Sequence, residues 1–101
     1  MAEVAAKPLM TLVAAHRDEL KAIVSRHHGR SVAVFGSVAR RDEGPQSDID
    51  LLVEFEQGAS LFDQVRIGQD AAELLGHPVD VVSAGGLRSE DDDIRADAVA
   101  L

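Results

Sequence analysis

The chain has no cysteine, tyrosine or tryptophan, and it has three phenylalanines. The absence of cysteine excludes disulfide bonds, thiolate metal sites and thiol nucleophiles. Few aromatic rings and a formal net charge of −8 argue against a surface that binds nucleic acid by stacking and phosphate neutralisation. No apolar run approaches the roughly 20 residues of a membrane span, and the first ten residues lack the apolar block of a secretory signal. These absences predict a cytoplasmic protein with no membrane or direct nucleic-acid partner.

Charged residues are distributed unevenly along the chain. Residues 1–41 sum to +4 and residues 42–101 to −12, and the acidic part includes the run Glu90–Asp93. An acidic half suits the binding of divalent cations or of a basic partner, although solubility alone is the simpler reading. Hydrophobic content of 46% and a length of 101 residues are typical of one small globular domain, which we expect to span residues 1–101.

Alternating helical and strand-like patterns predict an α/β (α+β) fold. Apolar residues at intervals of three or four positions predict a helix over 9–28, with Gly29 as its C-cap, and a second of about 15 residues after Ser60. A last helix or docked tail is expected over 87–101. Runs rich in β-branched residues predict strands over 31–35, 48–55 and 79–83. A small mixed sheet of three or more strands flanked by helices follows.

The second long helix has a recognisable start. Ser60 and Asp63 have the spacing of a capping box, in which each side chain bonds the other residue's backbone N–H. The apolar residues expected to shape this helix are Leu61, Phe62, Val65, Ala72 and Leu75.

Gly36 and Ser37 stand where the first strand ends and a helical turn begins. Glycine lets a ligand approach the backbone, and free N–H groups at a helix start attract anions. The Ser37 hydroxyl can donate a further hydrogen bond. The pair therefore predicts a phosphate-binding turn, with a simple helix cap as the alternative.

Asp48 and Asp50 are the carboxylates of an otherwise apolar strand. Alternation places Ile49, Leu51 and Val53 on one face and both aspartates on the other. Two like charges about 4 Å apart repel by about 4 kcal/mol at an effective dielectric constant of about 20, so a cation or a bound proton must compensate them. Hard oxygen ligands select Mg²⁺, Mn²⁺ or Ca²⁺. The alternative is a solvated pair at an exposed strand end.

Asp80 is the lone charge of the third strand. If that strand lies beside the strand of Asp50, three carboxylates converge with room for two metal ions. Together with the Gly36 turn they indicate a site of the nucleoside-triphosphate polymerase type. A solvated acid at a strand end is again the alternative.

Gly36 and Ser37, ten further residues, and then Asp48-x-Asp50 form one pattern, read in context as VAVFGSVARRDEGPQSDIDLLVEF. This pattern closely resembles the minimal nucleotidyltransferases (MNT) of the polymerase-β superfamily, which are antitoxins of HEPN toxins. The resemblance covers nearly the whole chain. Arg41 departs from it, because relatives commonly have glycine there.

The resemblance implies a Mg²⁺-dependent enzyme with one or two metal ions, Mn²⁺ being possible, that transfers AMP from ATP to a tyrosine hydroxyl of a partner HEPN ribonuclease. Asp48 and Asp50 would be metal ligands, and Asp80 a ligand or the base that accepts the hydroxyl proton. Gly36 and Ser37 would hold the β- and γ-phosphates. Arg40, one helical turn on, is a candidate phosphate contact or a solvated surface cation. The toxin and the enzyme would form a hetero-oligomer.

Two other functions remain open from the sequence. An inactive antitoxin would neutralise its toxin by contact alone, but such degenerate relatives typically lose one of the acids or the Gly-Ser pair. Transfer to a small molecule is the other alternative, and enzymes of that kind carry a further helical domain to hold the acceptor.

Overall fold

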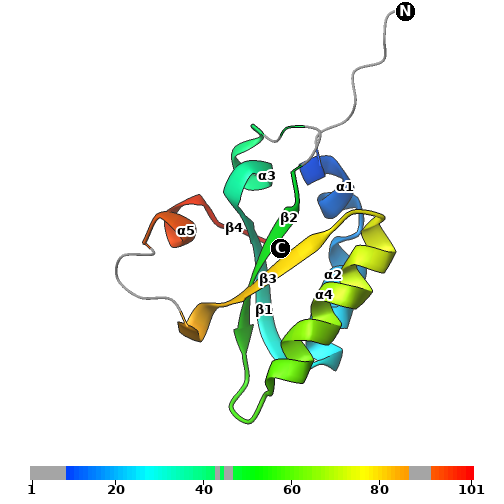
Figure 1. Ribbon diagram of the computed structural model, residues 1–101, viewed down its shortest axis with the longest axis vertical. Coiled ribbons are helices and arrows are strands. Elements are labelled where there is room, and N and C mark those ends of the chain that lie inside the picture. The colour runs from blue at the N-terminus through cyan, green and yellow to red at the C-terminus, as the bar shows by residue number, and fades with distance from the viewer. Residues whose placement is uncertain (1–8, 43, 45–46, 87–91) are drawn as a thin grey trace, which may run out of the picture.

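The computed structural model describes residues 9–42, 44, 47–86 and 92–101. Its elements, in chain order, are α1 (Leu9–Ala15), α2 (Arg17–Arg26), β1 (Gly29–Phe35), α3 (Gly36–Arg40), β2 (Ile49–Phe55), α4 (Leu61–Leu75), β3 (Val79–Ser83), the 3₁₀ turn η1 (Ala84–Gly86), α5 (Asp92–Asp97) and β4 (Val99–Ala100). Figure 1 shows α2 and α4 on one side of the sheet and α5 on the other.

The sheet has four strands in the order β3-β2-β1-β4. β1 pairs antiparallel with both β2 and β4, whereas β2 and β3 are parallel and are joined through α4. A parallel pair needs such a crossover connection. The predicted mixed sheet with flanking helices is thus confirmed, and β4 is a strand that the sequence patterns did not predict.

The core lies between one face of the sheet and the helices α2 and α4. Ile49, Leu51 and Val53 of β2 are fully buried, as the alternation predicted. The helices contribute buried residues at helical spacing, namely Leu20, Ile23 and Val24 from α2 and Ile67, Ala71 and Leu75 from α4. This packing fixes which face of β2 remains open.

α4 has the predicted length, and the apolar residues singled out in the sequence are divided between its two ends: Leu75 is buried in the core, whereas the three nearest the start are exposed. Leu61, Phe62 and Val65 are 73%, 76% and 48% exposed. Only residues from Ile67 onward enter the core, and the first turns of α4 line an open groove in which Leu61 and Val65 lie beside Val79 and Val81 of β3.

The predicted helix over 9–28 is wrong in two respects. It is two helices, separated at His16, whose backbone (φ −111°, ψ 22°) leaves the helical region. The expected C-cap Gly29 is instead the first residue of β1, and His28 takes the left-handed conformation with φ 66°. A side chain on Gly29 would overlap Val24, so close packing is what requires glycine there.

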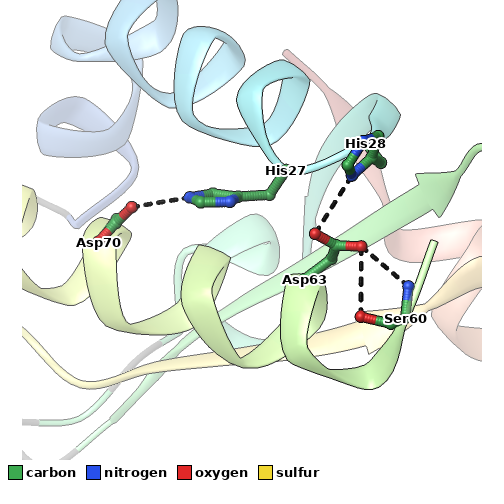
Figure 2. Close-up of polar contacts among 5 residues, drawn as sticks. All are labelled: His27, His28, Ser60, Asp63 and Asp70. Carbon is green, nitrogen blue, oxygen red and sulfur yellow. Dashed lines mark hydrogen bonds and ion pairs between the residues drawn. The ribbon is translucent and has the colours of Figure 1, made fainter.

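Two histidines join the turn between α2 and β1 to α4 (Figure 2). His27 Nε2 lies 2.9 Å from Asp70 Oδ2, and His28 Nδ1 lies 3.2 Å from Asp63 Oδ1. Asp63 also accepts a 2.8 Å hydrogen bond from the backbone N–H of Ser60, which completes the predicted capping box. The start of α4 is therefore fixed both to its own cap and to the neighbouring turn.

The last part of the chain forms α5 and then β4, so the helix or tail expected over 87–101 is a short helix followed by a strand. Residues 87–91, which include Glu90 and Asp91 of the acidic run, lie outside the described residues. None of the described helices combines the length and apolarity that a membrane span requires.

Candidate active site

Asp50 and Asp80 are neighbours on adjacent strands. Asp50 of β2 lies opposite Asp80 of β3 in the parallel register, so both project from the same face of the sheet. That face is the one turned away from the core, because the flanking Ile49 and Leu51 are fully buried on the other side. Asp48 comes directly before β2 and is exposed. The structure thus brings Asp50 and Asp80 together at one end of two paired strands, with Asp48 close along the chain.

The electrostatics of Asp50 reflect this arrangement. The pKa of the Asp50 carboxyl is raised, first by partial burial and then by the negative charges of Asp80 and Asp48, while Arg40 acts in the opposite direction. Asp50 is therefore a half-buried acid that two other acids repel. Such a site favours the binding of a proton or a cation.

Gly36 forms the turn that faces this acid. Its backbone has φ +74°, and a Cβ placed on it would overlap the Asp50 carboxylate. The register of the sheet explains the proximity, because Phe35, the last residue of β1, lies opposite Asp50. The turn between β1 and α3 is thereby packed directly against the acidic cluster.

Ser37 lies inside α3 and does not cap it. The N-cap position belongs to Phe35, which has an extended backbone and makes no side-chain capping bond. The half-buried Ser37 hydroxyl makes no hydrogen bond to the described part of the chain. Its donor is consequently available to a ligand at this turn.

Arg40 is held by two carboxylates on the surface. Its Nη1 donates to Asp97 Oδ2 at 2.8 Å, and its Nε donates to Asp42 Oδ2 at 3.2 Å. The two acids raise the pKa of the guanidinium, the hydrogen bond to Asp97 having the largest effect. Arg40 is therefore a solvated cation with fixed partners, close enough to lower the pKa of Asp50.

Arg41 follows as the C-cap of α3 and has a left-handed backbone with φ 61°. Glycine adopts this conformation without steric cost, whereas arginine does so under mild strain.

The acids offer suitable ligands for a hard divalent cation but do not complete its coordination. Among residues 9–42, 44, 47–86 and 92–101, no group of three or more His, Cys, Asp or Glu side chains is arranged to hold a metal ion by itself. The donor set consists of carboxylate oxygens, one of them on Asp50, whose raised pKa reflects first its burial and then its acidic neighbours. Mg²⁺ keeps water or phosphate oxygens in several of its positions, so a partial set of protein ligands suits it.

Asp97 and Asp42, which hold Arg40, were not identified from the sequence. The contact between Arg40 and Asp97 spans 57 positions, and no spacing rule predicts it. The pairing of β4 with β1, which brings this segment beside α3, involves only two residues of β4.

Comparison with known proteins places this geometry in context. A family model described as "Nucleotidyltransferase domain" matches residues 15–99. The chain is 34% identical over 89 residues to the protein adenylyltransferase MntA of Thermococcus cleftensis, which covers 88% of this chain and 87% of that protein.

Solved structures have the same fold. A structure assigned as a minimal nucleotidyltransferase superposes with a TM-score of 0.82 at 38% identity, covering 97% of this chain and 100% of the other. A chain from the complex of the tri-AMPylated Shewanella oneidensis HEPN toxin with MNT antitoxin superposes with a TM-score of 0.65 at 14% identity, covering 86% of this chain and 69% of the other, which is a likeness of fold.

Proposed function

Since the chain belongs to the nucleotidyltransferase domain family and is a nucleotidyltransferase of the minimal type that its sequence pattern resembled, we propose that it transfers AMP from ATP to a tyrosine hydroxyl of a HEPN-domain toxin in a Mg²⁺-dependent reaction. One observation carries this proposal: Asp50 lies beside Asp80 on the open face of the sheet, with the Gly36 turn packed against it. A phosphate-binding turn and a carboxylate cluster are the two parts that nucleotidyl transfer requires. The naming of MntA as a protein adenylyltransferase supports AMP as the transferred group, and the tri-AMPylated toxin of the Shewanella complex supports a HEPN toxin as the acceptor protein.

Each site residue has a proposed role. Asp48 and Asp50 hold one or two Mg²⁺ ions, and Asp80 is either a further ligand or the base for the acceptor proton. The backbone of Gly36 and the free Ser37 hydroxyl donate to the β- and γ-phosphates. Arg40 contacts the phosphates through guanidinium N–H groups that its two carboxylate partners leave free.

The transfer exchanges one phosphorus–oxygen bond for another. The acceptor oxygen attacks the α-phosphorus of ATP, the bond to the pyrophosphate oxygen breaks, and the hydroxyl proton passes to Asp80 or to water. The metal, when bound, neutralises phosphate charge and lowers the pKa of the attacking hydroxyl. The protein contributes by fixing the phosphates against the Gly36 turn and by placing the Asp50 carboxyl group next to them.

The position of the site agrees with a protein as the acceptor. Asp48 and Asp80 are exposed, and Asp80 lies opposite Asp50 on the face of the sheet turned away from the core. A tyrosine on another protein can approach such an open site. We therefore propose that the enzyme acts as a single domain and forms a hetero-oligomer with its HEPN toxin.

Incubation with a purified HEPN toxin, ATP labelled at the α-phosphate and Mg²⁺ tests the proposal. We expect label and mass increments of AMP on a toxin tyrosine, located by peptide mass spectrometry. Asp50→Asn should abolish labelling, whereas Glu54→Gln, on the same strand and the same face, should not.

The alternative of neutralisation by contact gives a different result. Stoichiometric inhibition of the toxin without ATP, and with no added mass, would replace the proposed reaction by simple binding. Full transfer by the Asp50→Asn variant in the presence of Mg²⁺ would contradict the assigned metal ligands.

A further inference from the structure

We propose that Asp97, in the last helix of the chain, is a positioning residue for nucleotide binding that acts through Arg40. The inference deepens the proposed function and rests on it, because it assigns Arg40 to the phosphates. A residue of the C-terminal segment, remote in sequence from the Gly-Ser turn and from the acids, thereby completes the nucleotide site.

Two hydrogen bonds restrict the Arg40 side chain. Asp97 accepts from Nη1 at 2.8 Å, and Asp42 accepts from Nε at 3.2 Å. A guanidinium has five N–H donors in a rigid plane, so these bonds fix its orientation and leave three donors for a ligand. An arginine that is already oriented loses less side-chain freedom when it binds phosphate.

Asp97 is itself anchored to the strand that leads into the phosphate turn. It is the last residue of α5, and β4 begins two residues later. β4 pairs with Ala33 and Val34 of β1, and the Leu101 N–H adds a 3.0 Å hydrogen bond to the carbonyl of Val32. β1 continues directly into Gly36. Asp97 and the Gly36 turn are therefore both held in place by β1.

The guanidinium is also close to the acids. The charge of Arg40 lowers the pKa of Asp50, opposing the effects of Asp80 and Asp48. Arg40 therefore lies within electrostatic range of a phosphate chain that spans the turn and the acids.

Asp97 could in principle compete with phosphate for Arg40 instead of orienting it. Both partners are partly exposed, with side-chain accessibilities of 48% for Arg40 and 33% for Asp97. Water and salt weaken the charge of Asp97 as a competitor for Arg40. The hydrogen bonds from Arg40 to Asp97 and Asp42 still define the plane of the guanidinium. Orientation is therefore the larger effect, and loss of Asp97 should weaken nucleotide binding.

The test compares Asp97→Asn and Asp97→Ala with the wild type in steady-state AMP transfer. We expect KM for ATP to rise about three- to tenfold, as for residues coupled in one ion-pair network, with kcat changed less than about twofold. Calorimetric affinity for a non-hydrolysable ATP analogue should fall by the same factor, and the unfolding midpoint should not change. Asp18→Asn, an exposed acid on α2, is the matched control and should leave KM unchanged.

A double-mutant cycle separates action through Arg40 from any other role. Arg40→Ala should itself raise KM, and adding Asp97→Ala to it should cause no further increase. An unchanged or lowered KM in Asp97→Asn, or an equal increase in the Arg40→Ala background, would overturn the inference. If the wild type transfers no AMP, the proposed function fails; if it transfers AMP and Asp97→Asn has the wild-type KM, only this inference fails.

Discussion

Gly36 and Asp50 are packed so closely that a methyl group on Gly36 would overlap the Asp50 carboxylate. The contact joins the two halves of the site, the turn after β1 and the acid on β2. Glycine is required here for two reasons, the left-handed backbone with φ +74° and the absence of space for a side chain.

Gly36→Ala should therefore abolish AMP transfer as well as reduce stability. Gly76→Ala is the matched control, because Gly76 has φ +71° but open space where a Cβ would lie. Both variants should lose about 1–2 kcal/mol of unfolding free energy from backbone strain, and only Gly36→Ala displaces Asp50. Denaturant unfolding and label transfer measure the two effects. Equal transfer by both variants would contradict the role of the contact.

Asp50→Asn should raise the free energy of unfolding at pH 7. The folded-state pKa of Asp50 lies above its usual value, because of burial and then of the charges of Asp80 and Asp48. A carboxyl of this kind favours folding while protonated, and this contribution is lost as the pH rises through the raised pKa. The gain from Asn should therefore disappear as the pH falls below about 3.9, the ordinary value for Asp.

Chemical denaturation of the wild type, Asp50→Asn and Glu54→Gln without divalent metal, at pH 7 and under acid conditions, gives the comparison. Glu54→Gln should show no such gain. A less stable Asp50→Asn protein at pH 7 would mean that the carboxylate is compensated within the protein.

Asp63 should have the opposite pH dependence. Hydrogen bonds from the Ser60 backbone and then from His28 hold its pKa below the usual range. Its contribution to stability is present above the unfolded-state pKa of about 3.9 and is lost as the pH falls through the lower folded-state value. Asp63→Asn should thus destabilise the protein at pH 7, with a difference that shrinks in acid.

The capping partner gives an independent check. Ser60→Ala should cost about 1 kcal/mol, a typical value for loss of a helix cap. Urea titrations over a pH series measure both variants, with Asp18→Asn as the control. A destabilisation by Asp63→Asn that is the same at every pH would refute the ionic origin of the effect.

The two halves of α4 should respond differently to truncation. Ile67 is fully buried, whereas Leu61 is 73% exposed. Ile67→Ala should cost about 2–5 kcal/mol through lost burial and a cavity, and Leu61→Ala should change stability by less than about 0.5 kcal/mol. Thermal and denaturant unfolding distinguish them. A large loss for Leu61→Ala would show that the first turn of α4 is covered in solution.

Local sequence patterns predicted the helices and strands whose geometry depends on residues close together in the sequence. The alternation around Asp50 gave the buried face of β2, and the spacing of Ser60 and Asp63 gave the start of α4. The same reasoning failed at His16 and Gly29, where a break and a close contact interrupt a continuous helical pattern. A periodic pattern does not show where tertiary packing will divide a helix.

The proximity of two of the three candidate acids was predicted for the same reason. The residue types of Asp48, Asp50 and Asp80 and their strands indicated a cluster, and the register then placed Asp50 beside Asp80. The contact between Arg40 and Asp97 depends on the two-residue strand β4, whose pairing arises only once the chain has folded. Contacts that depend on such long-range pairing leave no periodic signal in the sequence.

The central claim is that the acids on β2 and β3 hold a divalent cation together with the phosphates of ATP. Titration with Mn²⁺ in the presence of a non-hydrolysable ATP analogue, followed by electron paramagnetic resonance, tests it most directly. Binding beyond that of the nucleotide alone is predicted for the wild type and for Glu54→Gln, with an affinity at least about tenfold lower in Asp50→Asn, as expected when a metal-site carboxylate is lost. Equal Mn²⁺ affinity in Asp50→Asn and the wild type would contradict the account.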